Sequence, residues 1–507
     1  MRFWLRFRSR QRGGSSGRAS ARPPRRRPTP GPATPLQVVV VGGGIGGLAA
    51  ALLLGRRGHR VVVVEQEPVA APASLEDARW WWRSSAPQAA HAHVFPARCR
   101  ELLAAEAPDV LAALRRADVT EVRLTRQAPG TLTGPVDDDP RLVALAARRS
   151  VFEWVLRRAV LAERGVTMLS GLPAFGLVLD GADVPKVTAV RLSGGHLLTA
   201  DLVVDAAGRR SPVPDWLTAA GAPAPVIEEL PGGVTSHTRF YGVRGGAKPP
   251  TRVVGGVYDG YACRLVPADA GAFAVTFEVP EDERAFDGLV DGRAFDRAAS
   301  AVPGIAEWLD PSRSRRLTRV ARLTSADNRL RRLTRDGRPL VAGVLPVGDA
   351  VCATSPGLGH GVALAMLSAV RLVQAVDTNP GVGRADAEAR TLAMDAAIAA
   401  EIAPWFHDAA VRDRGVTVTA PSPEAPLTYP ELTLAAQRDP RVWTALTRLQ
   451  NLLVLPSAVL ADPDIVARAR GVLASGWQPE PDDVPSHDEL VALLSEQRHL
   501  AVAASGQ

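Results

Sequence analysis

Residues 36–64 alternate between apolar strands and an apolar helix. Residues 36–41 and 60–64 contain runs of consecutive apolar residues, mostly valine, which are typical of strands buried in a parallel sheet. Between them, residues 45–57 have the length and composition of a buried helix, and Gly58 ends it. We therefore predict one strand–helix–strand unit of a doubly wound α/β domain.

The following residues mix helical and strand patterns. Residues 97–117 have helical spacing, and residues 150–164 predict a second helix. Ser150 is its expected N-cap, and Glu153 three residues later completes a capping-box pattern. Residues 187–204, with a Gly-Gly turn in the middle, predict a hairpin that ends in a strand.

The second half of the chain changes its pattern twice. Residues 235–330 repeatedly alternate polar and apolar positions, which predicts an antiparallel sheet forming a second domain. Residues 341–376 return to a strand, a glycine-rich loop and a long apolar helix. From residue 382 the pattern is helical with proline-rich interruptions. The predicted fold class is α/β: a Rossmann-type domain, an antiparallel β-sheet domain and a helical C-terminal region.

The charge of the chain is concentrated at one end. The formal net charge is +7, but residues 1–35 hold ten arginines and no acidic residue, so the remaining residues carry a net charge of −3. A nucleic-acid-binding body is thereby disfavoured, because such a surface would be basic. We expect a disordered Arg-rich tail.

Two further features exclude other classes. The cysteines at positions 99, 263 and 352 are far apart and form no metal-binding or redox motif, so we expect no metal site and a reducing, cytoplasmic location. Residues 38–55 carry no charge and are long enough to suggest a membrane segment, but six of them are glycine. We therefore expect no transmembrane segment there.

The first chemical motif joins the predicted strand to the predicted helix. Its sequence is GGGIGG, a GxGxxG pattern formed by Gly42, Gly44, Ile45, Gly46 and Gly47 with the intervening glycine. Such glycines allow a tight turn and close approach of a pyrophosphate to the helix N-terminus. Glu65, eighteen residues after the motif, ends the second strand and is placed to accept hydrogen bonds from ribose hydroxyls. The pattern predicts a dinucleotide site.

The second motif follows the last predicted strand. Gly348-Asp349 is followed by a loop and then by an apolar helix; the loop and helix start comprise Pro356, Gly357, Gly359, His360 and Gly361. This order resembles the second flavin motif of the p-hydroxybenzoate hydroxylase-like flavoprotein monooxygenases. The resemblance implies that Asp349 contacts the ribityl and pyrophosphate region of FAD and that the Pro-Gly loop meets the flavin ring.

The third motif, around Asp205 and Gly208, is similar to the central strand motif of the same superfamily. The hydroxylases usually carry Asp directly before this glycine, but here that position is Ala207 and the acid is Asp205, as in related reductases, cyclases and halogenases. We count Asp205 and Gly208 among the FAD-binding residues. The departure weakens the case for direct NAD(P)H docking of the hydroxylase kind.

Other stretches extend the resemblance over roughly residues 36–380. Arg149 leads a helix similar to one that lies near FAD in the family, and the segment containing His91 and His93 is similar to one in bacterial relatives that include flavin epoxidases. His91, His93, Arg239 and Tyr241 are candidates for the substrate pocket, and the packing of a strand is an equally good explanation for the last two.

The resemblance implies an FAD-dependent monooxygenase, a hydroxylase or epoxidase of secondary metabolism that acts on a bulky apolar, polyketide or aromatic substrate through a flavin hydroperoxide. Only one GxGxxG is present, so electrons would come from transiently bound NAD(P)H or from a separate flavin reductase. The alternatives are a reductase of the geranylgeranyl reductase type and a non-catalytic flavin-binding protein tethered by its basic tail. A halogenase is less favoured, since the lysine that follows the first glycine motif in such enzymes is missing.

The catalytic residues, the substrate and the oligomeric state are not specified by these patterns. The expected organisation is a tail (1–35), a first part of the FAD-binding domain (36–215, with an insertion at 67–148), a substrate domain (216–335), a second part of the FAD-binding domain (336–381) and a helical region (382–507).

Overall fold

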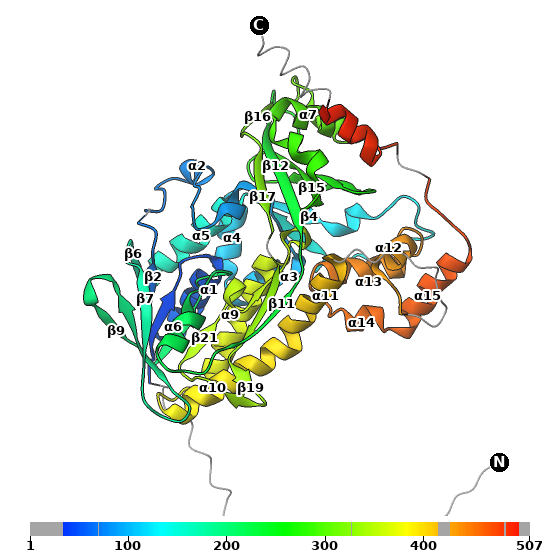
Figure 1. The fold of residues 1–507 in the computed structure, drawn as a ribbon. Helices are drawn as coiled ribbons and strands as arrows, with labels where there is room; N and C mark the ends of the chain where they lie inside the picture. Colours follow the sequence, from blue (N-terminus) through cyan, green and yellow to red (C-terminus); the bar gives the residue numbers. More distant parts are fainter. Residues whose placement is uncertain (1–33, 69, 326, 414–425, 481–482, 496–507) are drawn as a thin grey trace, which may run out of the picture.

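The computed structural model describes residues 34–68, 70–325, 327–413, 426–480 and 483–495 (Figure 1). The predicted tail therefore lies outside the described residues, apart from its last two positions. All statements below refer to this described part of the chain.

A parallel sheet forms the centre of the first half of the fold. Its strands, in spatial order, are β21 (Val344–Pro346), β10 (Leu202–Asp205), β1 (Gln37–Val41), β2 (Arg60–Glu65) and β6 (Val166–Ser170). Every neighbouring pair is parallel. The predicted strand–helix–strand unit is confirmed, with α1 spanning Ile45–Arg56 and Gly58 in the left-handed region at φ 85°.

The two faces of this sheet are covered differently. Helices pack on one face and share one core with β1, namely α1, α3 (Ala97–Glu106), α4 (Pro108–Arg116), α5 (Arg149–Ala162) and α9 (Gly361–Thr378). The other face carries α6 (Val213–Ala219) and the antiparallel strands β7 (Ala174–Leu179), β8 (Val187–Leu192) and β9 (Leu197–Thr199). α9 is long and apolar enough to cross a membrane, but 72% of it is buried inside the protein, as expected of a core helix.

Two local predictions were wrong. The helix expected over residues 97–117 is two helices, because Pro108 starts a second helix after a break at Ala107. The capping box at Ser150 is absent, since α5 already begins at Arg149. The Glu153 carboxylate forms an ion pair with Arg83 instead.

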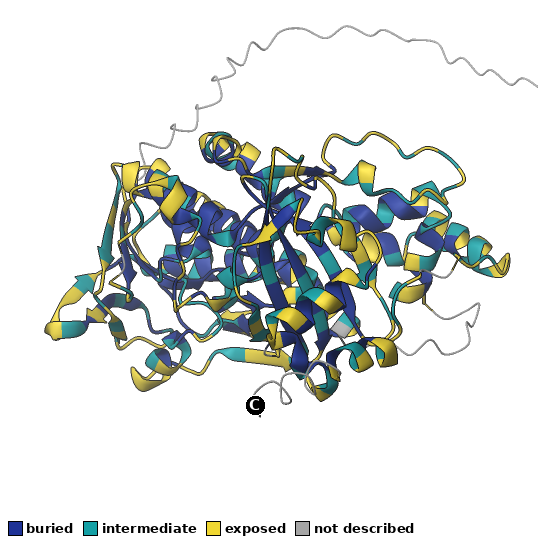
Figure 2. Ribbon diagram, turned by 90° about the horizontal axis from the view of Figure 1, so that it is seen from above, coloured by how far each residue is buried: buried dark blue, intermediate teal, exposed yellow. Residues whose placement is uncertain are grey.

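An antiparallel sheet forms the second half. Its strands are β13 (Val254–Val257), β14 (Ala262–Pro267), β15 (Ala272–Pro280), β12 (Val234–Val243), β16 (Ser314–Arg316) and β17 (Ala321–Thr324), the last two both paired with β12. One face packs against η4 (Arg284–Val290), α7 (Gly292–Ser300) and α8 (Ala306–Leu309). Figure 2 shows buried residues running from the helical layer into these strands.

Three smaller sheets complete this part of the fold. β3 (Val94–Phe95), β4 (Thr120–Arg123) and β5 (Val143–Ala146) form one, β11 (Val226–Leu230), β18 (Asn328–Arg332) and β22 (Cys352–Ala353) a second, and β19 (Thr334–Arg335) and β20 (Arg338–Pro339) a third. β22 lies within the second motif, between Gly348-Asp349 and the Pro-Gly loop, and its pairing with β18 ties that motif to the strand that follows the antiparallel sheet in the sequence.

The described part of the C-terminal region is mostly helical, and its last helical stretch covers residues 487–495. It comprises α10 (Arg384–Ala397), η7 (Ile398–Ile402), α11 (Ala403–Asp413), α12 (Tyr429–Ala436), α13 (Pro440–Gln450), α14 (Ser457–Leu460) and α15 (Pro463–Ala474). The final segment leaves these helices and returns to the antiparallel sheet, beside α7 in Figure 1. Leu490 and Leu494 are buried in the core of that sheet, and the Tyr261 hydroxyl donates to the carbonyl of Pro485 at 2.6 Å.

Candidate cofactor and active site

The first glycine loop is held by contacts that leave no room for side chains. Gly42 has φ 110°, and a Cβ there would lie 2.4 Å from the carbonyl oxygen of Ala206 on the neighbouring strand. A Cβ on Gly47 would lie 2.1 Å from the oxygen of Gly42. Gly44 differs, because a Cβ there would meet no atom within 4 Å. The loop is thus packed on the sheet side and open at Gly44, next to the start of α1 at Ile45.

The fold brings the two glycine motifs together although about 300 residues separate them. A Cβ on Gly46 would lie 3.5 Å from the Cα of Gly348, and one on Gly361 would lie 4.0 Å from Oδ1 of Asp349. Asp349 therefore lies at the N-terminus of α9 and close to the N-terminus of α1, and both termini offer free N–H groups to an anion.

The Asp349 carboxylate lies among arginines. Burial raises its pKa, while the charges of Arg149, Arg209 and Arg331 oppose that rise. Among the described residues no donor forms a hydrogen bond with its oxygens, so they remain available to hydroxyl groups of a ligand. Arg149, at the start of α5, is close enough to the second motif for its charge to act on Asp349, and its place near FAD stays a prediction.

Glu65 ends β2 and is deeply buried, and its carboxylate already has partners. Oε2 accepts hydrogen bonds from the backbone N–H of Gly43 at 3.0 Å and from Arg83 at 2.6 Å, and Oε1 accepts from the N–H of Glu67 at 3.0 Å. A carboxylate offers about four acceptor positions. Glu65 therefore retains room for one further donor, such as a ribose hydroxyl.

Arg83 is the main residue that sequence reasoning missed here. Its guanidinium group contacts Glu65, Glu67 and Glu153 and donates to the carbonyl of Gly43 at 3.2 Å. It comes from the irregular loop after β2, which has no periodic pattern. The only available signal was its position directly after three tryptophans.

One of those tryptophans also belongs to the site. Trp81 is buried, and the centre of its ring lies 5.3 Å from the guanidinium carbon of Arg157. Arg157 in turn donates a hydrogen bond to the carbonyl of Gly43 at 3.2 Å. Trp80 and Trp82 are 40% and 44% exposed. One ring of the aromatic run therefore packs against Arg83 and Arg157, which bind the glycine loop, and the other two rings are partly exposed.

Asp205 has a different role from the expected one. Its two oxygens accept hydrogen bonds from the Ser211 hydroxyl at 2.8 and 2.7 Å, and one also accepts from the N–H of Ala207 at 3.1 Å. Burial raises its pKa to about 6. The carboxylate thus holds the loop after β10, and the open position in this loop is Gly208, where a Cβ would meet nothing within 4 Å.

The Pro-Gly loop faces the antiparallel sheet. Pro356 and Gly357 lie in a short 3₁₀ turn, Gly359 follows at φ 68°, and a Cβ on Gly357 would lie 3.1 Å from Oε1 of Glu278 on β15. His360 points elsewhere: its ring packs edge-on against Trp405 at 5.5 Å, and burial lowers its pKa to about 3. The His360 ring is thus engaged by Trp405, and the assignment of His360 to the cofactor-binding residues stays a prediction.

His91 and His93 lie between the part of the fold built on the parallel sheet and the part built on the antiparallel sheet. His91 is hydrogen-bonded through Nδ1 to the Thr238 hydroxyl at 2.9 Å, and Thr238 is bonded to Thr276 at 2.9 Å. Nδ1 of His93 donates to the carbonyl of His91 at 3.0 Å. Burial lowers the pKa of His91 to about 4 and that of His93 to about 3, so both are neutral near pH 7.

The assignment of Arg239 and Tyr241 to the pocket was wrong. Both side chains bind Asp296 on α7, on the face of β12 that packs away from the glycine loops. Successive strand residues point to opposite faces, so the neighbours Thr238 and Phe240 take the inward positions. Phe240 packs with Ala92 of the histidine segment.

The structure fits a dinucleotide cofactor at the junction of these loops. The Cβ positions of Gly44 and Gly208 are open. Four buried polar atoms of the motifs and their neighbouring segments have no hydrogen-bond partner among the described residues: Trp81 Nε1, Arg149 Nε, Thr354 Oγ1 and Ser355 Oγ. Within the same residues, no three His, Cys, Asp or Glu side chains cluster in a way that could hold a metal ion.

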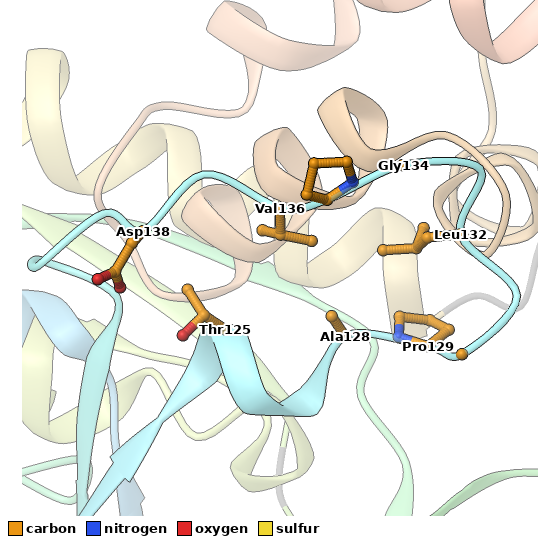
Figure 3. Close-up of a pocket in the computed structure, with 9 residues that line it drawn as sticks. Thr125, Ala128, Pro129, Leu132, Gly134, Val136 and Asp138 are labelled. Atoms are coloured by element: carbon orange, nitrogen blue, oxygen red, sulfur yellow. The ribbon is translucent and has the colours of Figure 1, made fainter.

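A separate hollow of about 520 Å³ lies away from these motifs (Figure 3). It is lined by the loop between β4 and β5, including Pro129, Leu132 and Val136. This loop is held to the C-terminal helices through the N–H of Thr133, which donates to the carbonyl of Arg438 at 3.0 Å. None of the candidate cofactor residues lines this hollow.

Comparison with known proteins agrees with this geometry. Residues 37–155 match the family model described as FAD dependent oxidoreductase. No curated protein matches the chain at a significant level.

Several solved structures share the fold. PqsL, a probable FAD-dependent monooxygenase from Pseudomonas aeruginosa, is 21% identical, with 76% of this chain and 96% of that chain covered and a TM-score of 0.52. The flavin-dependent brominase Bmp2 is 16% identical over 87% of this chain and 99% of its own, with a TM-score of 0.53. The myxobacterial chondrochloren halogenase CndH is 19% identical over 90% and 95%, with a TM-score of 0.52.

The family match over residues 37–155 and the two glycine motifs identify an FAD-dependent oxidoreductase domain with FAD as its cofactor. The fold of the chain is shared with PqsL, with the brominase Bmp2 and with the halogenase CndH.

Proposed function

We propose that this protein is an FAD-dependent monooxygenase, a hydroxylase or epoxidase, that acts on a bulky apolar, polyketide or aromatic substrate. The observation that carries the proposal is the position of the Pro-Gly loop. Gly357 lies against Glu278 on the inward face of the antiparallel sheet, so the loop expected to meet the flavin ring is adjacent to the strands that would line a substrate pocket. The fold shared with PqsL supports the same activity.

Bound FAD would supply the electron transfer and the activation of oxygen. The glycine loop and the N-termini of α1 and α9 would bind its pyrophosphate, Glu65 and Asp349 its sugar hydroxyls, and Arg149 would add positive charge nearby. The neutral His91 and His93 would close the pocket without introducing charge, since burial holds the pKa of each well below 7. A dry pocket of this kind protects reactive species from water.

The electron donor and the location complete the proposal. Among the described residues Asp205 is engaged by its own loop, and the sequence has a single GxGxxG. We infer that electrons come from transiently bound NAD(P)H or from a separate flavin reductase, and that the enzyme works in the cytoplasm.

Three alternatives remain, two enzymatic and one without catalysis. A reductase of the geranylgeranyl reductase type would use the same cofactor site without oxygen transfer. A halogenase is less favoured: the lysines are Lys186 and Lys248, and Lys186 donates to the carbonyl of Val382 at the far side of β8. A non-catalytic protein tethered by its basic tail would bind flavin but show no turnover.

The test is the reaction of the reduced, FAD-loaded protein with oxygen in a stopped-flow spectrophotometer. Oxygen transfer predicts a transient absorbance band distinct from those of reduced and oxidised flavin. Direct reoxidation without the transient would instead favour the reductase. A folded protein that binds no FAD would contradict the whole assignment. Removal of residues 1–35 should leave FAD content and turnover unchanged, whereas the tether hypothesis predicts loss of localisation.

A further inference from the structure

The inward face of the antiparallel sheet carries a charged pair in an otherwise mostly uncharged surface. Arg264 on β14 contacts Oε2 of Glu278 on β15 at 2.5 Å. Arg264 lies directly opposite Thr276, which shares its face with Glu278 two residues further on. The Thr276 hydroxyl is bonded to Thr238, the partner of His91, so this row faces the cofactor-binding half.

The pair is partly exposed and only partly satisfied. The Glu278 side chain is 17% exposed and that of Arg264 is 30% exposed. Within the described residues, no donor forms a hydrogen bond with Oε1 of Glu278, and the guanidinium of Arg264 has N–H groups with no other acceptor. Oε1 is also the atom nearest the Cβ position of Gly357, at 3.1 Å. A free acceptor therefore lies at the Pro-Gly loop, with free donors beside it.

Apolar surface borders the pair. Val257 lies in the same cross-strand row as Ala262 and Glu278, and 74% of its surface is exposed. Phe240 and Ala274 lie on the same face on the other side of the pair. A ligand in this position would contact the polar groups of Glu278 and Arg264 and otherwise apolar side chains.

We propose that Glu278 and Arg264 select an uncharged substrate in which a hydroxyl or N–H group stands next to a carbonyl. The substrate donor binds Oε1 of Glu278, and its carbonyl accepts from Arg264. Since the pair has no net charge, and a carboxylate would meet Glu278, an anionic substrate is disfavoured. This inference rests on the proposed function, because it assumes that the substrate binds between the Pro-Gly loop and the sheet.

Three naphthalene probes test the selection on the full-length, FAD-loaded protein. The probes are 1-hydroxy-2-acetonaphthone, its methyl ether 1-methoxy-2-acetonaphthone, and the anion 1-hydroxy-2-naphthoate. Binding is measured by the change in the visible absorption of the flavin, which requires no turnover. We expect the hydroxy ketone to bind about 10- to 100-fold more tightly than its methyl ether, the usual effect of a hydrogen bond to a charged group, and also more tightly than the anion.

Two variants separate a binding role from a structural one. Glu278→Leu should reduce the preference for the hydroxy ketone over its ether to less than about twofold. Glu278→Gln keeps an acceptor but removes the charge, so it should retain part of that preference and bind the naphthoate more tightly than the wild type does. Glu307→Gln, which breaks the exposed pair of Glu307 with Arg313, is the matched control and should change neither ratio. FAD content and the thermal midpoint verify that each variant is folded.

The selection is overturned if the hydroxy ketone and its ether bind equally to the wild type, if none of the probes binds, or if Glu278→Leu keeps the preference. The oxygen reaction measured without substrate reports on the proposed function alone. If the transient absorbance band were absent from that reaction while the preference for the hydroxy ketone over its ether still depended on Glu278, oxygen transfer would be refuted. The proposed binding site would then remain supported.

Discussion

The cofactor-binding loops and the inward face of the antiparallel sheet are built in opposite ways. The first cofactor loop is a run of glycines whose positions are set by backbone contacts, as at Gly42 and Gly47. The sheet face is made of single residues such as Thr238, Thr276 and Glu278, each separated from the next inward residue by one that points outward. The first region depends on the absence of side chains, and the second depends on which side chains point inward.

This difference determines what substitutions should do. A side chain added to a packed glycine forces backbone atoms apart, and such atoms cannot rotate away. A side chain changed on the sheet face alters only what a ligand meets. Substitution effects should therefore be large and structural in the loops, and small but selective on the sheet.

The largest effect is expected for Gly47→Ala. Its Cβ would lie 2.1 Å from the oxygen of Gly42 and 2.9 Å from the Cβ of Ala206. We expect a loss of more than about 4 kcal/mol in the free energy of unfolding, in the range reserved for severe overpacking. Chemical denaturation of the purified variant, or its failure to accumulate in soluble form, measures this.

Gly44→Ala is the matched control within the same motif. Its added methyl group meets no atom of the chain, so the unfolding free energy should change by less than about 1 kcal/mol. The methyl group would, however, project into the space where a pyrophosphate approaches, and FAD affinity should fall at least about tenfold, or about 1.4 kcal/mol. Equal destabilisation by the two substitutions would contradict the distinction between a packed and an open side of the loop.

The second prediction concerns pH and His360. Burial lowers the pKa of His360 from 6.5 to about 3, so the folded state keeps this ring neutral while the unfolded chain protonates it. Its contribution to stability is present above pH 6.5 and is lost as the pH falls toward 3. At 1.36 kcal/mol per pKa unit the loss is at most about 5 kcal/mol.

His360→Phe should keep the packing against Trp405 and flatten the stability profile between pH 6.5 and 4. Denaturation curves at several pH values, compared with the wild type, give the slope directly. An unchanged slope would mean that other buried histidines dominate the acid sensitivity of the protein.

The third prediction tests the arginine that holds the glycine loop. Arg83→Met removes the cation that pairs with Glu65, Glu67 and Glu153 and leaves these carboxylates close together. Breaking a buried pair by removing one partner typically costs about 3–5 kcal/mol. We expect a loss of this size in unfolding free energy. Arg115→Met, which breaks an exposed pair with Glu121, should cost less than about 1 kcal/mol.

The sequence was most informative where a motif is contiguous. The first strand–helix–strand unit and its glycine turn could be predicted because period, length and turn chemistry all agree over residues 36–65. Arg83 could not, because its role comes from three carboxylates on β2, on α5 and in the loop after β2, and nothing local marks it. Asp205 is an intermediate case: its place in the motif was clear, but only the structure shows that Ser211 occupies its carboxylate.

On the sheet, alternation predicted strands but could not say which face is inward. Arg239 and Tyr241 are large and polar, which suggested a pocket, but α7 supplies Asp296 on their side. The face is decided by a helix that follows β12 by about 50 residues, so no local pattern could reveal it. Thr238, which does point inward, is small and uncharged, so nothing in the sequence favoured it over Arg239 and Tyr241.

The smallest effect is expected for Tyr241→Phe, and it tests the assignment of the two faces most directly. The substitution removes one hydrogen bond to Asp296, which still receives Arg239 and Arg316. We expect a cost of about 1–2 kcal/mol in the free energy of unfolding and no change in ligand affinity. Thr238→Val, one strand neighbour away from Arg239, should instead disturb the contact with His91 and change the affinity for the hydroxy ketone probe with little loss of stability. If Tyr241→Phe altered probe affinity and Thr238→Val did not, the inward face of β12 would be the opposite of the one assigned, and Glu278, which shares its face with Thr276 and Thr238, could no longer be a substrate-binding residue.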